Sequence, residues 1–465
     1  MVQVKIALPK GQLQNSTAAL FKEAGCAIAD YREGSRSYRL RCDSAPDLFL
    51  KVFHEKDIAI QVAVGNYDLG ICRLGWVDEL LSKYRSDAVV KVHDLGYGKR
   101  NLYAVASRAS GLNSVEALRK YKASVRIVSE YPNLAEAFAL KQRLRRFQIF
   151  PVWGAAGVYP PENAEVAIVS ETSADRLQEQ GLVPLATLLE SSAYLVANKN
   201  SLQNKDLSRL LKALSSKEIK EADVSEEAVG GARVGARASS TEKSRISLAL
   251  PDGHQQRHVV DFLNRAGLRI DGYRAGNGLR MDFDGVMVKV VRPQDMPLQV
   301  ANGNFDLAIT GRDWLRDCLY RFPSSPVTEL LNLGFGKVRI VAVVSRDLPV
   351  SCTDDLRKVK RESALRVASE YINIADKYAN DNHLTPCKLI PTWGASEAFL
   401  PEDADVLIEN TETGSTISRH NLKIIDTLFE STACLIGNTD AMKRPEKKKE
   451  IAHIIDAMSR GAAAS

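Results

Sequence analysis

The pattern of hydrophobic and polar positions predicts short buried strands that alternate with amphipathic helices. Apolar positions at helical spacing run from residue 14 to residue 24. Such alternation favours α/β layers with largely parallel sheets, in which ligands bind near the carboxyl ends of the strands. Short apolar runs, typical of strands with both faces covered, occur at residues 4–8, 48–53, 69–72, 102–106, 125–128 and 166–169.

The motifs of the first half of the chain return in the same order in the second half. A repeat of this length indicates duplicated domains and not a solenoid of small repeats. The matching pairs are Leu-Pro-Lys-Gly at 8–11 with Leu-Pro-Asp-Gly at 250–253, Gly-Asn-Tyr-Asp-Leu at 65–69 with Gly-Asn-Phe-Asp-Leu at 303–307, Leu-Gly-Tyr-Gly-Lys at 95–99 with Leu-Gly-Phe-Gly-Lys at 333–337, and Trp-Gly-Ala at 153–155 with the same tripeptide at 393–395.

The segment between the two copies has the composition of a linker. It is rich in Gly, Ala and Ser and has few large apolar residues, which is typical of a flexible connection. Helical spacing of apolar positions at 207–214 and 451–458 predicts that each copy ends in an amphipathic helix. We therefore predict a first unit at 1–220, a flexible linker at 221–244 and a second unit at 245–465.

Composition and charge exclude several classes of protein. The chain is 45% hydrophobic and 26% charged, as expected for a soluble globular protein, and no apolar run is long enough to span a bilayer. Its amino terminus lacks an export signal, which predicts a cytoplasmic protein. The seven cysteines are scattered without a CxxC pair, so we expect reduced cysteines and neither a zinc site nor a disulfide framework. A net charge of +6 without a basic stripe argues against nucleic acid as a partner.

Residues 404–417, ADVLIENTETGSTI, form the strongest candidate for a ligand-binding segment. An apolar strand leads into a Gly-containing turn with several hydroxyl side chains, and a helix pattern follows. Backbone N–H groups of such a turn bind anions, and an acidic residue at the strand end can accept hydrogen bonds from ribose hydroxyls. The alternative is an ordinary helix N-cap, because Ser and Thr often do only that. The candidate contacts are Glu409, Thr411, Thr413, Gly414, Ser415 and Thr416.

Several motifs of the second copy together resemble the ATP phosphoribosyltransferases. Besides 404–417, the copy carries VRPQDMP at 291–297, DLAITGRD at 306–313 and LGFGK at 333–337. The resemblance covers nearly the whole chain, once per copy. It implies two α/β lobes around a cleft in each copy, as in type II periplasmic binding proteins. The fold class is then α/β, a tandem duplication of a bilobal unit with four lobes in all.

The resemblance also implies a reaction. The phosphoribosyl group of phosphoribosyl diphosphate would be transferred to N1 of ATP with release of diphosphate, which is the first step of histidine biosynthesis, with Mg²⁺ as cofactor. This chemistry depends on positioning and electrostatic stabilisation and not on a nucleophilic side chain, so we assign no catalytic residue and no metal ligand. The expected small-molecule partners are ATP and phosphoribosyl diphosphate, with histidine as an inhibitor; no nucleic acid or membrane is expected.

Four other side chains of the second copy are candidates for the same cleft. Arg292 would hold a phosphate, or it is a solvated surface charge. Asp313 would orient a substrate hydroxyl, or it caps a helix. Lys337 lies in a Gly-x-Gly-Lys turn that lacks the spacing of a P-loop and can be purely structural. Glu397 occupies a position close to the cleft in the family pattern.

The first copy has lost the features of the ligand-binding segment. Its residues 169–177 read VSETSADRL, with Val169 in place of Glu409 and Ala174 in place of Gly414. Asp175 puts a negative charge where a phosphate would lie, and like charges repel. We therefore expect that the first copy does not bind phosphoribosyl diphosphate in the usual way.

The second copy has diverged at its opening turn, where Asp252 and His254 replace the Lys and Arg of the family. Catalytic units of the family pair as dimers, so we predict an internal pseudo-dimer or a homo-oligomer in which the first copy lends basic residues to the second. For the arginines among them, the alternative is one solvated strand face. The first-copy candidates are Lys10, Gly11, Arg36, Arg39 and Arg41.

A competing interpretation is a non-catalytic regulatory or ligand-sensing paralogue of the enzyme. The altered turn of the second copy and the altered segment 169–177 of the first motivate it. The retained Glu409 and residues 413–416 argue against it. No regulatory domain is expected after the second copy, so feedback control would come from the degenerate first copy or from a partner.

Overall fold

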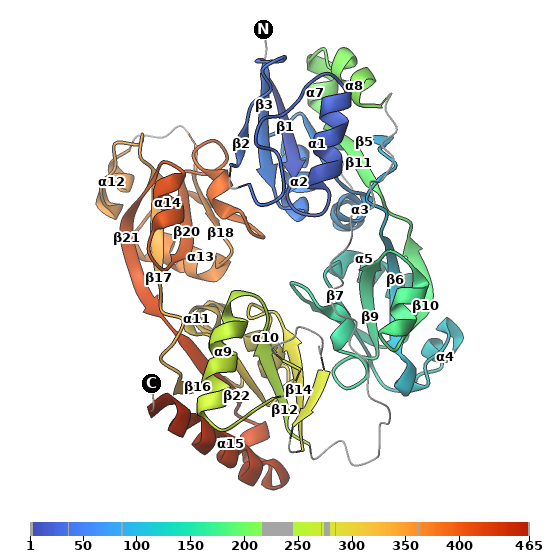
Figure 1. The fold of residues 1–465 in the computed structure, drawn as a ribbon, viewed down its shortest axis with the longest axis vertical. Helices are drawn as coiled ribbons and strands as arrows, with labels where there is room; N and C mark the ends of the chain where they lie inside the picture. The colour runs from blue at the N-terminus through green and yellow to red at the C-terminus, as the bar shows by residue number, and fades with distance from the viewer. Residues whose placement is uncertain are drawn as a thin grey trace.

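The computed structural model describes residues 3–35, 37–84, 87–215, 245–270, 272–273, 280–283, 285–359 and 363–463. The predicted linker at 221–244 lies outside these residues, as does Arg36. Four β-sheets with helices on their faces make up four lobes, two in each unit (Figure 1). Across the described ranges, no helix combines the length and apolar character needed to cross a membrane.

In the first unit the chain crosses between two lobes twice. It leaves the first lobe after β5 (Val89–Asp94) for β6 (Asn101–Ser107), and it returns after β10 (Leu182–Leu189) to β11 (Ala193–Asn198). The six-stranded sheet has the order β2 (Arg39–Leu40), β3 (Leu48–Phe53), β1 (Val4–Pro9), β4 (Leu69–Arg73), β11 (Ala193–Asn198) and β5 (Val89–Asp94). The five-stranded sheet has the order β10 (Leu182–Leu189), β6 (Asn101–Ser107), β9 (Val166–Glu171), β7 (Val125–Ser129) and β8 (Phe147–Pro151). The helices are α1 (Gln14–Glu23), α2 (Glu55–Ala63), α3 (Leu74–Lys83), α4 (Val115–Arg119), α5 (Pro132–Lys141), α6 (Ala174–Glu179), α7 (Lys199–Asn204) and α8 (Ser208–Ser215).

The second unit repeats this arrangement. Its six-stranded sheet has the order β13 (Arg280–Phe283), β14 (Val286–Val291), β12 (Ser247–Pro251), β15 (Leu307–Gly311), β22 (Ala433–Asn438) and β16 (Val327–Asn332). Its five-stranded sheet has the order β19 (Cys387–Pro391), β18 (Leu365–Ser369), β20 (Val406–Thr411), β17 (Val338–Ser345) and β21 (Leu422–Ser431). The helices are α9 (His254–Arg265), α10 (Met296–Ala301), α11 (Arg312–Arg321), α12 (Thr353–Lys358), α13 (Ile372–Asp381), α14 (Ser415–Arg419) and α15 (Pro445–Ala463).

Two expectations from the sequence are wrong. The sheets are mixed and not largely parallel: β11 runs antiparallel to both of its neighbours, because the chain returns from the other lobe to fill the place between β4 and β5. Cys26 and Cys42 form a disulfide, although reduced cysteines were expected. A β-bridge between Ile28 and Cys42 brings the two segments together, and no spacing motif announces it.

The two units pack head to tail, so that each unit's six-stranded lobe lies on the other unit's five-stranded lobe. One apolar core joins Phe53 of the first unit to Phe399 of the second, and another joins Tyr159 of the first to Phe305 of the second. Figure 1 shows the first pairing as the blue lobe beside the orange one. The two contacts are related by approximate two-fold symmetry, because each uses equivalent surfaces of the two copies.

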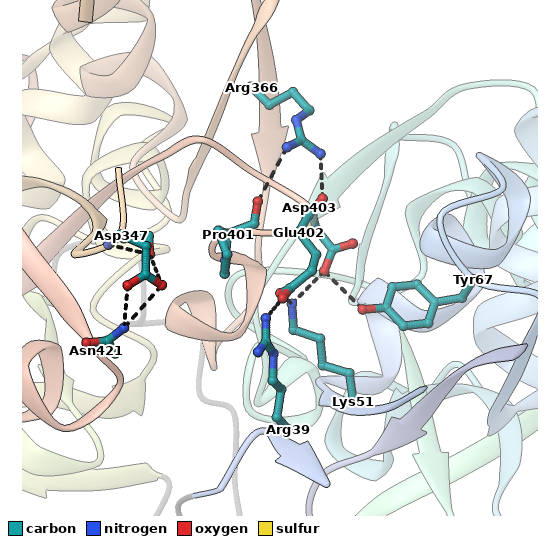
Figure 2. A network of polar contacts seen from close by, with 10 residues as sticks. Arg39, Lys51, Tyr67, Asp347, Arg366, Pro401, Glu402, Asp403 and Asn421 are labelled. Atoms are coloured by element: carbon teal, nitrogen blue, oxygen red, sulfur yellow. Dashed lines mark hydrogen bonds and ion pairs between the residues drawn. The ribbon is translucent and has the colours of Figure 1, made fainter. Parts of the chain in front are cut away.

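A buried lysine fixes each of these two contacts. Lys51 on β3 donates to Glu402 at 2.9 Å and to Asp403 at 2.8 Å, and Asp403 also accepts the Tyr67 hydroxyl at 3.1 Å (Figure 2). At the pseudo-symmetric position, Lys289 donates to the first unit. Its acceptors are the Tyr159 carbonyl at 2.9 Å, Asn163 Oδ1 at 2.7 Å and, as an ion pair, Glu162 at 2.9 Å.

Candidate functional site

The hydroxyl loop, which we define as residues 411–416, joins β20 to α14 in the second unit. Gly414 has a φ of 77°, a left-handed conformation that L-residues with a side chain seldom adopt. The Thr411 hydroxyl is buried and accepts the Gly414 N–H at 2.9 Å, so Thr411 holds the turn in shape. Thr413 accepts the Ser415 N–H at 3.4 Å and stays exposed, as does Ser415, while Thr416 is half-buried. Thr411 and Gly414 therefore form the turn, and the other three hydroxyls lie at its surface.

Glu409 lies just before this loop, in what we call the carboxylate cluster: Glu370, Glu397 and Glu409. Burial, followed by repulsion from Glu397, raises the pKa of Glu370 to about 7. Burial, followed by repulsion from Glu370 and Glu397, raises the pKa of Glu409 well above its usual value. The structure thus brings Glu397 and Glu409 together at the hydroxyl loop. It adds Glu370, for which the only signal in the sequence is the tripeptide Ser-Glu-Tyr, present at 129–131 and again at 369–371.

The first unit contributes a further carboxyl group to this region. Burial raises the pKa of Asp57, and repulsion from Glu370 of the second unit adds to the effect. The Trp393 backbone N–H donates to Asp57 across the unit boundary and opposes the shift. One Asp57 oxygen is buried without a hydrogen-bond partner. The region therefore has several acidic groups close together, and a bound cation would reduce the repulsion between them.

Mg²⁺ is the cation that the resemblance to the ATP phosphoribosyltransferases implies, and the donor set shows how well the residues suit it. Among the residues that the structure describes, no three His, Cys, Asp or Glu side chains are placed to hold a metal ion together. The carboxylate cluster is thus no ready-made metal cage. Mg²⁺ that arrives on a diphosphate needs only one or two carboxylates from the protein, and the oxygen donors of the cluster suit that binding mode.

Glu370→Gln should stabilise the free protein at pH 8. Because the folded-state pKa of Glu370 is raised from 4.5 to about 7, its charge costs almost no stability at pH 4.5 and below. The cost grows between pH 4.5 and pH 7 and is nearly complete at pH 8. Removing the charge should raise the free energy of unfolding by up to about 3 kcal/mol at pH 8 and leave it unchanged at pH 4.5. Urea unfolding at both pH values measures this, with Glu430→Gln, an exposed site, as control. An equal effect at both pH values would contradict the electrostatic cause.

The equivalent region of the first unit has a different charge. Glu130, the counterpart of Glu370, pairs with Lys56 at 3.6 Å, and Gly157 and Val169 stand where the second unit has its other two carboxylates. The first unit therefore has one carboxylate beside a cation where the second unit has three carboxylates.

The first-unit loop also contains its own anions. Glu171, the counterpart of Thr411, accepts the Thr172 N–H at 2.7 Å and lies 3.9 Å from Arg100. Asp175, the counterpart of Ser415, lies in the first turn of α6. An anionic ligand would have to displace or oppose both carboxylates.

The remaining second-unit candidates are Arg292, Asp313 and Lys337, and each is held by a partner outside the hydroxyl loop. Arg292 pairs with Asp252 at 3.0 Å and packs against Gly154 of the first unit. Asp313 is buried and accepts the Tyr371 hydroxyl at 2.8 Å, which ties the two lobes of the unit together. Lys337 is exposed and pairs with Glu430 at 2.9 Å.

The described first-unit candidates have four different surroundings. Lys10 lies 5.2 Å from the centre of the Tyr38 ring, and that ring stacks on His420, the residue that ends α14 after the hydroxyl loop. Gly11 has a φ of 87° and forms the turn after β1. Arg39 forms an ion pair with Glu402, which precedes β20, whereas the hydroxyl loop follows it (Figure 2). Arg41 is exposed.

The chain is similar to a family of known proteins. Residues 54–216 and 292–460 match the family described as ATP phosphoribosyltransferase. The ATP phosphoribosyltransferase of Prosthecochloris aestuarii is 30% identical over 212 residues, which are 46% of this chain and 70% of that protein. The one from Sulfolobus acidocaldarius is 33% identical over 208 residues, 44% of this chain and 69% of that protein.

Among solved structures, the ATP phosphoribosyl transferase (HisG:HisZ) complex from Thermotoga maritima aligns with 47% of this chain and 100% of that chain, at 18% identity and a TM-score of 0.40. The family match alone covers most of both units, once in each. The chain belongs to the ATP phosphoribosyltransferase family.

Proposed function

We propose that the second unit transfers the phosphoribosyl group of phosphoribosyl diphosphate to N1 of ATP and releases diphosphate. The observation that carries this proposal is the meeting of the hydroxyl loop with the carboxylate cluster at one end of β20. A turn that offers hydroxyls and backbone N–H groups suits the 5′-phosphate of the sugar. Carboxylates beside it suit the ribose hydroxyls and the positive charge that develops on the ribose during transfer.

The residues of this chain would act by binding and by electrostatics. Thr413, Ser415 and Thr416 hold the 5′-phosphate, and Glu409 accepts hydrogen bonds from the ribose. Glu370 and Glu397 would hold Mg²⁺ through an oxygen each. When bound, Mg²⁺ neutralises charge on the leaving diphosphate. No covalent intermediate with the protein is needed, because diphosphate leaves as N1 of ATP approaches the same carbon.

Thr416→Ala should lower kcat/KM for phosphoribosyl diphosphate by about 10- to 100-fold, since a hydrogen bond to a charged group is worth roughly 1.5–3 kcal/mol. The assay is product formation from ATP, phosphoribosyl diphosphate and Mg²⁺. Arg176→Ala changes the equivalent position of the first unit and should leave the rate unchanged. Turnover that is insensitive to Thr416→Ala would place the site elsewhere.

The second candidate function is a non-catalytic ligand-sensing or regulatory subunit. It is favoured by one observation: the opening turn of the second unit carries Asp252, held by Arg292, where the family has a lysine. A folded intact chain that binds phosphoribosyl diphosphate but forms no product would support this function and contradict the first.

A further inference from the structure

We propose that Lys10, Tyr38 and His420 form a stack across the unit boundary that positions the hydroxyl loop. Tyr38 and Lys10 of the first unit are then positioning residues of the second unit's site. The proposal rests on the proposed function for its kinetic consequence, whereas its structural consequence can be measured without any turnover.

The stack has three layers. The Tyr38 and His420 rings lie nearly parallel, with centroids 4.7 Å apart and planes inclined by 28°. The Lys10 ammonium lies 5.2 Å from the Tyr38 centroid, within range of a cation–π contact. Tyr38 packs against the core between the units and against the core of its own lobe. These contacts hold the Tyr38 ring, the middle layer of the stack, in place.

His420 is the residue through which this anchor reaches the hydroxyl loop. It ends α14, which spans only Ser415–Arg419 and begins inside the loop. The His420 N–H donates to the Thr416 carbonyl, so the imidazole is attached to the last loop residue by one helical turn. Ile417 of the same helix is buried in the core between the units. A helix this short has few hydrogen bonds of its own, so these outside contacts set its orientation.

Burial lowers the pKa of His420, and the positive charges of Arg419 and Lys10 lower it further, against the opposing effect of Glu397. A neutral imidazole stacks on a tyrosine ring without the cost of burying a charge. The charges of Lys10 and of Glu397 therefore both act on the His420 side chain. The stack therefore also holds a cation of the first unit on the same side chain that Glu397 of the carboxylate cluster influences.

The pseudo-symmetric position has different residues in the two outer layers of such a stack. In the repeat, the counterpart of Lys10 is Asp252, which forms an ion pair with Arg292. The counterpart of His420 is Gln180. The loop beside Gln180 is the one that carries Glu171 and Asp175. The hydroxyl loop of the second unit therefore occurs together with Lys10 and His420, whereas the equivalent loop of the first unit has neither residue beside it. This pairing explains why the first unit keeps the opening-turn lysine that the second unit has lost.

The test compares Tyr38→Ala, Tyr38→Phe and His420→Gln in the full-length chain. Hydrogen exchange of residues 412–420 is measured against that of residues 172–180 in the same sample. Tyr38→Ala and His420→Gln should increase exchange in 412–420 only, and Tyr38→Phe, which keeps the ring, should restore protection. In the transferase assay, the first two variants should raise KM for phosphoribosyl diphosphate about fivefold to tenfold with a smaller change in kcat.

The outcomes separate this proposal from the proposed function. If the unchanged chain is inactive but exchange rises as described, the stack is correct and the transferase function is not. If the unchanged chain is active and neither exchange nor KM responds in Tyr38→Ala or in His420→Gln, the stack does not position the loop. Exchange that rises equally in both loops would show general destabilisation and would also overturn the proposal.

Discussion

Ser415→Asp should abolish most of the activity. The change puts into the hydroxyl loop the residue that the first unit has at Asp175. Two negative charges about 4 Å apart near a protein surface repel by about 4 kcal/mol, which corresponds to roughly a thousandfold loss in kcat/KM for phosphoribosyl diphosphate. Steady-state kinetics with phosphoribosyl diphosphate as the varied substrate measures the loss.

Two variants serve as controls, one for the size of the new side chain and one for the unit in which the charge lies. Ser415→Asn has the same shape as the aspartate without its charge and should lose much less than Ser415→Asp. Asp175→Ser, in the first unit, should leave the rate as it is. Similar losses in Ser415→Asp and Ser415→Asn would mean that charge is not the cause and that this loop does not hold the phosphate.

Lys51→Ala should lower the free energy of unfolding by about 3–5 kcal/mol, the usual cost of removing one partner of a buried ion pair. The Lys51 side chain is 1% exposed, and its loss removes the cation that pairs with both Glu402 and Asp403. Glu402 keeps its ion pair with Arg39. Because these groups join one unit to the other, the loss also weakens the contact between the units. Urea unfolding followed by circular dichroism measures the change.

Lys443→Ala is the matched control. Lys443 pairs with Asp440 on the surface with 75% of its side chain exposed, and such pairs are worth about 0–1 kcal/mol. Lys289→Ala, at the pseudo-symmetric contact, should behave like Lys51→Ala because its side chain is fully buried. If Lys51→Ala costs no more than Lys443→Ala, the buried lysines do not hold the units together.

Local features of the fold were predictable from the sequence. The apolar run at 48–53 coincides with β3, and the helical spacing at 14–24 with α1. The direction of β11 was not predictable, because it depends on a return from the other lobe that no local pattern records. The disulfide between Cys26 and Cys42 was not predictable because the bridge between Ile28 and Cys42 that brings the two segments together has no spacing motif.

The candidate site was predictable where it is continuous in sequence. The hydroxyl loop and Glu409 form one segment, so their motif could be recognised. Glu370 was missed because it belongs to the site only through convergence with Glu397 and Glu409, which lie on different elements. The partner of Arg39 could not be predicted either, since Glu402 is distant in the chain and adjacent only after the units have packed.

We expect each chain to have one site for phosphoribosyl diphosphate, in the second unit. Titration calorimetry of the intact chain with phosphoribosyl diphosphate and Mg²⁺ tests it most directly. One molecule should bind per chain, and none should bind at the same concentrations in Ser415→Asp. Two molecules per chain, or one molecule whose binding survives Ser415→Asp, would contradict it.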